Sequence, residues 1–345
     1  MSSPLIDIIV PVYNGEQYIP DFLAQFEAQD HSDGSVRIIF VDDGSDDNSL
    51  QLLREASVTK DIPIHLISCQ HGGVSAARNA GIWESTADYI AFFDVDDICS
   101  SDYLSSLKSA AGKGEYDVLL FCRKIIFDDK GTAIDNSEDS GSLEPGVRSV
   151  LLKEILTDET RFGGIHCILL NRSFVEREQL FFAEGYPYYE DTEYLYRVIA
   201  MAEGGIKVLN KYLYGYIARH DGSAMARFTP DRIRCLSLLE NLEDMFEQKV
   251  PEFAPLYKRY GVSRIYWSVL WQAALAAPSL SVFRKFAYDT GAQEQMRKVA
   301  GFPDSKVNIL RRLFIMSQPM YYATVRALGS RYSKAKWEMD GETLP

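Results

Sequence analysis

The sequence is poor in the residues from which zinc sites and disulfide-linked folds are built. Its 345 residues include five cysteines and five histidines, and no two cysteines form a CxxC pair. An odd number of widely scattered cysteines indicates neither a zinc site nor a disulfide framework. The chain therefore fits a reducing cytosol.

Positive charge is also scarce. Lysine and arginine number 36 against 49 acidic residues, which gives a formal net charge of −13. Nucleic acid requires a cationic binding face, so we expect no nucleic-acid partner for the whole molecule.

The N-terminus lacks the basic segment of a signal peptide and carries Asp7 within its apolar run. We expect a first strand at residues 6–13 and a protein that stays inside the cell.

Strand-like and helix-like segments alternate over the first hundred residues. The segment after the second strand places Ser45 as a candidate helix N-cap, with Asp46 and Asp47 in the first turn. Near-continuous apolar strands joined by helices are typical of a mostly parallel sheet covered on both faces. The sequence predicts an α/β fold whose first strands lie at residues 6–13, 36–41, 62–68 and 88–93.

The pattern becomes helical after about residue 226. We expect two parts, residues 1–225 and a helical extension over residues 226–345. Residues 265–283 contain no charged side chain, which raises the possibility of a membrane span. Gln272, several serines and Pro278 interrupt this run, so a buried packing helix is the favoured interpretation.

Acidic side chains follow two of the predicted strands. Asp42 and Asp43 end the second strand, and Asp94, Asp96 and Asp97 end the fourth. Ligands of such sheets bind at the carboxyl ends of the strands, so both loops are expected at one crevice. Carboxylates this close repel one another, and a divalent cation, often bound with phosphate, would relieve the repulsion. The alternative is that these aspartates only cap helices and fill turns.

Five segments together resemble the family 2 glycosyltransferases, which have a GT-A fold. They are "IIVPVYNGEQYI", "IIFVDDGSDDNS", "GGVSAARNAGI", "DYIAFFDVDDICSSDYL" and "FFAEGYPYYEDTEYLYRV", and the resemblance covers about residues 5–225. It implies inverting transfer of a hexose or N-acetylhexosamine from a nucleoside diphosphate sugar, with uridine diphosphate expected, to an acceptor hydroxyl.

The resemblance also implies roles for single residues. Asp94, Asp96 and Asp97 would hold Mn²⁺ or Mg²⁺, and Asp94 would also contact the donor. Asp191 would be the catalytic base, with Glu190 beside it. The remaining donor-binding residues would be Pro11, Val12, Tyr13, Glu16, Asp42, Arg78, Asn79 and His220, with Asp42 accepting a hydrogen bond from uracil.

Several of these residues have a simpler explanation. A helical arginine such as Arg78 is often only a salt-bridging side chain, and acidic residues such as Glu190 and Asp191 are favoured in any first helical turn. His71 and Ile168 stand where relatives often have asparagine and lysine, so they inherit no role.

Two other functions fit parts of the sequence. A phosphohydrolase with a DxDx(T/V) motif fits poorly, because the acidic run follows three strand–helix units and does not stand near the N-terminus. A nucleotide-sugar binder without turnover is the other alternative.

Residues 305–337 form an unusual cationic segment. They include seven lysines and arginines, no acidic residue, and interleaved apolar side chains. Basic amphipathic segments dock on anionic membranes, so we expect peripheral contact with the inner face of the plasma membrane. The acceptor implied by the resemblance is a growing glycan, as in a lipid-linked surface-polysaccharide precursor. The alternative is a basic helix packed on the acidic catalytic domain.

Overall fold

The computed structural model describes residues 5–112, 116–126, 134, 143–157, 162, 164–218, 235–298 and 305–339. The chain forms two compact units, Met1–Ser223 and Ala224–Pro345. The functions predicted for these two parts stay predictions.

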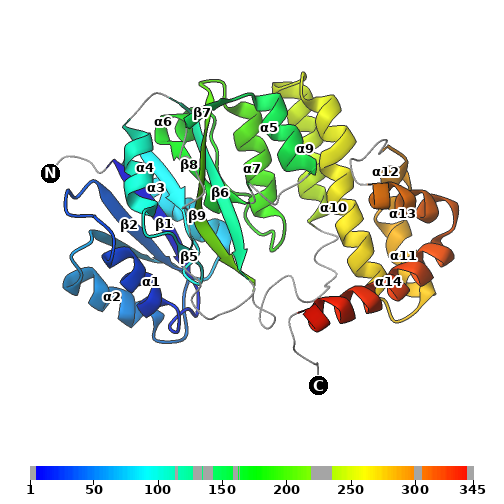
Figure 1. Cartoon of the computed structure of the whole chain (residues 1–345), viewed down its shortest axis with the longest axis horizontal. Coiled ribbons are helices and arrows are strands. Elements are labelled where there is room, and N and C mark those ends of the chain that lie inside the picture. Colours follow the sequence, from blue (N-terminus) through cyan, green and yellow to red (C-terminus); the bar gives the residue numbers. More distant parts are fainter. Residues whose placement is uncertain are drawn as a thin grey trace. The chain divides into compact units, whose positions relative to one another are not determined.

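One mixed sheet organises the first unit (Figure 1). Its parallel half has the strand order β3-β2-β1-β4. These strands are almost entirely apolar, and β1, β2 and β4 are buried because helices cover both faces of the sheet. Their bounds are β1 (Ile6–Val12), β2 (Val36–Asp42), β3 (Ile64–Ser68) and β4 (Tyr89–Phe92), which confirms the predicted α/β class.

The other half of the sheet contains later strands in mixed directions. From β4 the order continues β8-β6-β9-β5, and β7 pairs with β9. Strand β8 is antiparallel to both β4 and β6, whereas β6 and β9 run parallel. The bounds are β5 (Ile98–Cys99), β6 (Val118–Ile126), β7 (Leu143–Gly146), β8 (Ile168–Asn171) and β9 (Ile206–Ile217).

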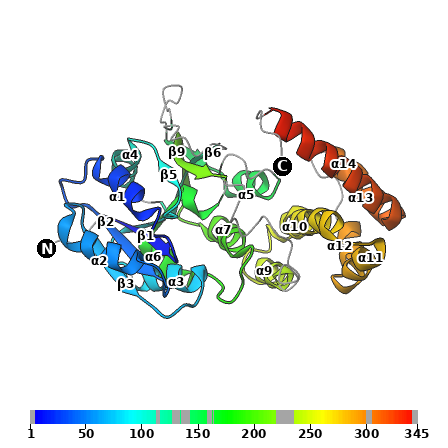
Figure 2. The ribbon, with the colours of Figure 1, turned by 90° about the horizontal axis from the view of Figure 1, so that it is seen from below.

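Helices cover both faces of this sheet. Phe22 and Phe26 of α1 and Tyr103 of α4 share a buried cluster with Ile8 of β1. Helix α3 packs on the opposite face, where a Cβ on Gly81 would lie 2.4 Å from Ile9 Cγ2. Figure 2 shows α1 and α4 on one side of the strands and α3 on the other. The helices are α1 (Ile19–Glu27), α2 (Ser49–Thr59), α3 (Val74–Glu84), α4 (Tyr103–Ala111), α5 (Arg148–Thr157), η1 (Ile165–Cys167, 3-10), α6 (Arg172–Arg177) and α7 (Glu190–Met201).

The predicted start of α2 was wrong. The helix begins at Ser49 with Asn48 as its N-cap, not at Ser45. The Ser45 hydroxyl instead accepts a hydrogen bond from the Asn14 backbone at 3.0 Å, and Asn14 Oδ1 accepts one from the Asp46 backbone at 2.8 Å. Residues 43–48 therefore form a loop that is hydrogen-bonded to the loop after β1.

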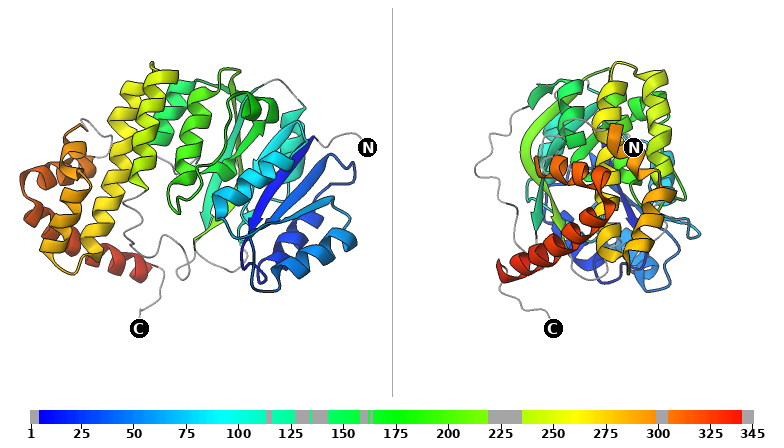
Figure 3. Two further views of the ribbon diagram at one scale, coloured as in Figure 1. Left: turned by 180° about the vertical axis from the view of Figure 1, so that it is seen from behind. Right: turned by 90° about the vertical axis from the view of Figure 1, so that its right-hand side faces the viewer.

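The second unit is helical in its described part, as expected. Its helices, coloured yellow to red in Figure 3, are α9 (Leu236–Lys249), α10 (Ala254–Ala276), α11 (Leu280–Asp289), α12 (Ala292–Lys298), α13 (Ser305–Met316) and α14 (Gln318–Met339). No helix within the described residues is long and apolar enough to cross a membrane. Helix α10 ends at Ala276, two residues before Pro278.

Candidate functional site

A cavity opens at the carboxyl ends of β1, β2 and β4. Its volume is about 350 Å³. The loop after β1 contributes residues 11–15, the loop after β2 contributes Asp43, and the turn after β4 contributes residues 94–96. Tyr18, His71 and the start of α3 complete the described lining. This is the position at which α/β sheets bind ligands, because the connecting loops of parallel strands meet there.

Aromatic rings form one part of the cavity wall. Tyr13 is 47% exposed and stacks on His71, with ring centroids 4.2 Å apart and an interplanar angle of 26°. Pro11 and Val12, also predicted at the donor site, line the same cavity. Glu16 is not among the lining residues, because its carboxylate accepts hydrogen bonds from the Asn48 backbone and side chain, each at 2.9 Å.

The acidic residue that lines the cavity after β2 is Asp43, whereas the expected contact of Asp42 with uracil stays a prediction. Asp42 is 1% exposed at the end of the strand and is absent from the cavity lining. Successive residues of an extended chain point to opposite sides, so the side chains of Asp42 and Asp43 have different surroundings. Asp43 accepts hydrogen bonds from the Gly72 and Gly73 backbones at 2.8 and 2.9 Å, and its Oδ2 lies 2.9 Å from His71 Nδ1.

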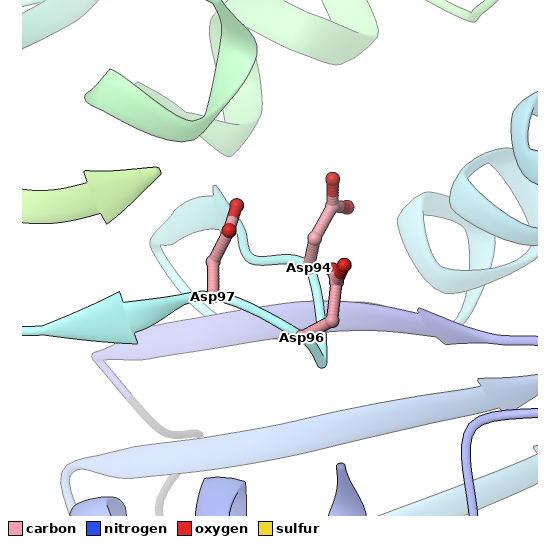
Figure 4. A group of neighbouring side chains, drawn as sticks. All are labelled: Asp94, Asp96 and Asp97. Atoms are coloured by element: carbon pink, nitrogen blue, oxygen red, sulfur yellow. The ribbon is translucent and has the colours of Figure 1, made fainter. Parts of the chain in front are cut away.

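Three aspartates gather in the turn after β4. One oxygen from each of Asp94, Asp96 and Asp97 lies within 4.8 Å of the others. Figure 4 shows the three side chains rising from the same turn and pointing to the same side. The Asp97 backbone donates a hydrogen bond to the Asp94 carbonyl at 3.1 Å, which holds the turn closed. We call these residues the acidic triad.

Asp94 is held by two basic side chains. Its Oδ1 accepts a hydrogen bond from Arg78 Nη2 at 3.1 Å, and its Oδ2 lies 3.0 Å from His166 Nε2. Burial opposes the negative charge, but the attraction of His166 and Arg78 outweighs burial and lowers the pKa of Asp94. Asp94 is therefore ionised at neutral pH.

Asp97 lies deeper and has different partners. It is 3% exposed, and its carboxylate accepts hydrogen bonds from the Tyr214 hydroxyl and, at 2.9 Å, from the Ile217 backbone. Burial, together with the nearby charges of Asp94 and Asp96, raises the pKa of Asp97 to about 7, although the hydrogen bonds from Tyr214 and Ile217 act in the opposite direction. A cation at the triad would favour the ionised form.

Arg78 joins the triad to the start of α7. It is 3% exposed, and its Nη1 lies 3.5 Å from Glu190 Oε1. Burial raises the pKa of Glu190 to about 7, helped by the charge of Asp191 and opposed by Arg78. Arg78 does not line the described cavity, so its predicted contact with the nucleotide stays a prediction.

Asp191 and Asn79 are also held by neighbouring groups. Asp191 Oδ1 accepts a hydrogen bond from the Thr192 backbone at 2.6 Å. The Asn79 amide donates to the Phe182 carbonyl at 3.0 Å and to Glu184 Oε1 at 2.9 Å, and its oxygen accepts from the Phe182 backbone at 2.7 Å. Asn79 thus anchors the segment that leads to α7, and it is absent from the cavity lining.

One predicted donor-site residue cannot be placed, and several residues at the site were not predicted. His220 lies outside the described residues. His71 and the pair His166 and Tyr214 were missed as functional candidates, whereas Asp43 was expected with Asp42 at the ligand crevice. The sequence offered a signal for Asp43, which adjoins Asp42, but none for His166 and Tyr214, because only the folded sheet brings them to the triad.

The comparison with known families decides the class of protein. Residues 7–178 match the family model "Glycosyl transferase family 2". The chain belongs to glycosyl transferase family 2. It is 29% identical over 269 residues to the uncharacterized glycosyltransferase EpsJ of Bacillus subtilis, covering 75% of this chain and 72% of EpsJ. The predicted family is confirmed, and the protein is a glycosyltransferase.

Solved structures show the same fold. Residues 1–349 of Staphylococcus aureus TarS, solved with UDP-GlcNAc, superpose with a TM-score of 0.66 at 18% identity, covering 99% of this chain and 93% of that chain. The mannosyltransferase PcManGT of Pyrobaculum calidifontis, solved with GDP-Man and Mn²⁺, gives a TM-score of 0.52 at 16% identity, covering 97% and 89%. Both comparisons support the GT-A fold of this family 2 glycosyltransferase.

Proposed function

We propose that this glycosyltransferase moves a hexose or N-acetylhexosamine from a uridine diphosphate sugar to an acceptor hydroxyl, with inversion at the anomeric carbon. The observation that carries the proposal is a single cavity lined both by the Tyr13 and His71 rings and by Asp94 and Asp96. Rings suit a base, and the acidic residues suit a diphosphate with its cation. TarS, a fold neighbour, was solved with UDP-GlcNAc, which favours uridine.

The acidic triad fits a divalent cation. Mg²⁺ prefers carboxylate oxygens, as does Mn²⁺, and three such groups stand within 4.8 Å of one another. Asp94, Asp96 and Asp97 would hold the ion. Once bound, it would supply positive charge for the leaving diphosphate. A fold neighbour solved with Mn²⁺ supports this assignment.

The start of α7 would supply the base. In this proposal Asp191 accepts the proton of the acceptor hydroxyl while that oxygen attacks the sugar on the face opposite the diphosphate. Glu190 is buried against Arg78, so we assign it to orienting the site. Arg78 would hold the triad and the start of α7 in fixed positions relative to each other, since it contacts both.

We further propose a growing glycan as acceptor, carried on a lipid-linked surface-polysaccharide precursor. The cationic segment 305–337 would bring the enzyme to the inner face of the plasma membrane through contact with anionic lipid. TarS bears the name poly(ribitol-phosphate) β-N-acetylglucosaminyltransferase, which is consistent with an acceptor that is a polymer.

The metal-dependent part of this function is tested by Asp96→Ala. Asp96 lies in a turn at the cavity, so its removal relieves repulsion and should leave the fold intact. In titrations of uridine diphosphate, the parent should bind more tightly with Mn²⁺ than without it, and the variant should show no such gain. Asp61→Ala, an exposed residue outside the cavity, is the matched control. A variant with the parent's metal-dependent gain would refute the proposal.

The donor sugar is tested by a panel of nucleoside diphosphate sugars with Mn²⁺ present. The true donor should raise the melting temperature most, because at equal ligand concentration a tighter ligand stabilises the folded state more. The same donor should release uridine diphosphate when acceptor is supplied. Stabilisation without release would favour a nucleotide-sugar binder over an enzyme.

A further inference from the structure

Two stacked rings lie buried beside the acidic triad. The rings of His166 and Tyr214 have centroids 5.1 Å apart and an interplanar angle of 14°. They come from η1 and β9, which are distant in sequence. Both side chains are buried, His166 to 8% exposure and Tyr214 completely. Neither lines the cavity at which the donor is proposed to bind.

Each ring contacts a different aspartate of the triad through a polar atom. His166 Nε2 lies 3.0 Å from Asp94 Oδ2, a close polar contact whose geometry falls outside that of a hydrogen bond. The Tyr214 hydroxyl donates a short hydrogen bond to Asp97 Oδ2. The stack therefore ties together the two outer members of the triad.

The second oxygen of each outer aspartate is also held. Arg78 Nη2 donates to Asp94 Oδ1 at 3.1 Å, and the Ile217 backbone donates to Asp97 Oδ1 at 2.9 Å. Two contacts of this kind fix both the position and the rotation of a carboxylate. A carboxylate offers about four lone-pair sites, so each group keeps capacity for a cation.

Such contacts fix the orientation of the triad carboxylates. Unrestrained carboxylates at this separation turn away from one another, because like charges repel. Groups behind metal-binding side chains commonly fix the direction of those side chains, and removing one such group typically costs about 10- to 100-fold in metal affinity. We propose that the stacked pair His166 and Tyr214 positions the acidic triad so that Asp94 and Asp97 face one divalent cation together. This inference rests on the proposed metal-dependent transfer.

A packing role and a positioning role make different demands on these residues. Packing needs two rings of the right size, whereas positioning needs the His166 nitrogen and the Tyr214 hydroxyl. His166→Phe and Tyr214→Phe keep the rings and remove these polar atoms. His166→Gln places an amide near the former Nε2 and should restore part of the contact. His65→Phe and Tyr212→Phe make the same chemical changes on β3 and β9, at half-buried or exposed positions outside the cavity.

The experiment is a calorimetric titration of the full-length chain with Mn²⁺, followed by uridine diphosphate with and without Mn²⁺. We expect His166→Phe and Tyr214→Phe each to weaken Mn²⁺ binding by about 10- to 100-fold. His166→Gln should lose less than His166→Phe. The metal-free affinity for uridine diphosphate should stay within about twofold of the parent, since neither ring lines the cavity. Both control variants should bind Mn²⁺ as the parent does.

The outcomes separate this inference from the function on which it rests. If the folded Phe variants bind Mn²⁺ as tightly as the parent, the pair is packing and the inference fails, while the proposed function stands. If the parent itself binds no Mn²⁺, the metal part of the proposed function fails and the inference fails with it. If one Phe variant does not fold, the other decides: Mn²⁺ affinity equal to the parent's overturns the inference, and a loss of about 10-fold or more supports it.

Discussion

Glu190 and Asp191 are adjacent residues with different surroundings. Glu190 is buried beside Arg78, whereas Asp191 accepts a hydrogen bond from the Thr192 backbone within its own helix turn. Asp191→Asn keeps the shape of the side chain but cannot take a proton. We therefore expect turnover to fall by roughly 10² to 10⁴, with donor and Mn²⁺ affinity near normal. Initial rates at saturating donor and acceptor, together with donor titration, measure this.

Glu190→Gln is the comparison that assigns the base. It should lower turnover less than Asp191→Asn. A rate for Asp191→Asn within a few-fold of the parent would place the base elsewhere, and the pKa of about 7 at Glu190 would make that residue the next candidate. A loss of donor affinity in Asp191→Asn would instead show a structural role at the start of α7.

The raised pKa of Glu190 also predicts a pH dependence of stability. The folded state holds the proton up to about pH 7, whereas an ordinary glutamate loses it near pH 4.5. The stabilisation is therefore fully present below pH 4.5 and is lost as the pH rises to about 7. Glu190→Gln should remove this decline, which amounts to at most about 3 kcal/mol of unfolding free energy. Urea denaturation of both proteins at pH 4.5 and 8, in metal-free buffer, measures the difference. If the unfolding free energy changes by the same amount between pH 4.5 and 8 in both proteins, the pKa of Glu190 is not raised.

At the scale of elements, the segment between residues 182 and 189 links α3 to α7. Asn79 holds this segment with three hydrogen bonds, and Tyr189 enters α7 with a left-handed backbone at φ 66°. Such a conformation is uncommon for a side chain of this size and is maintained only by its surroundings. The direction of Glu190 and Asp191 therefore depends on how this segment is anchored.

Asn79→Ala separates an anchoring role from the predicted contact with the nucleotide. If Asn79 anchors the segment, turnover falls and the unfolding free energy drops by on the order of 2 kcal/mol, while donor affinity is retained. Asn171→Ala, which removes the N-cap of α6, is a control for general destabilisation. Weaker donor binding with unchanged stability would show instead that Asn79 reaches the nucleotide.

The sequence predicted the parallel half of the sheet better than the mixed half. β1, β2 and β4 are nearly continuous apolar runs because both of their faces are buried, and such runs stand out in a sequence. The short β5 and the partners of β9 depend on pairing between distant segments, which no local pattern encodes. For the same reason the triad was predicted from one turn, whereas His166 and Tyr214 were not.

At the scale of the whole molecule, the cationic segment is part of the second unit rather than a detachable tail. Phe314, Tyr321 and Val325 are completely buried, and Tyr321 stacks on Phe283 with centroids 5.8 Å apart. Arg311 and Arg326 donate to backbone carbonyls of Met296 and Ala277. Removing residues 306–345 would expose this core and destabilise the unit, so truncation cannot isolate membrane binding.

Charge substitution tests membrane contact without this damage. Lys306 and Arg312 are exposed, and exposed Met316 and Met320 follow them in sequence. Each cation near an anionic surface contributes about 1 kcal/mol, so Lys306→Gln with Arg312→Gln should weaken binding to vesicles containing phosphatidylserine on the order of 10- to 30-fold.

The control is Lys60→Gln with Lys108→Gln, which makes the same charge change in the first unit. Sedimentation with vesicles at low and high salt measures the binding, and unchanged melting temperatures show that the fold is intact. Equal loss in both double variants would mean that net charge, not this segment, governs binding, and no loss in either would rule out the membrane contact.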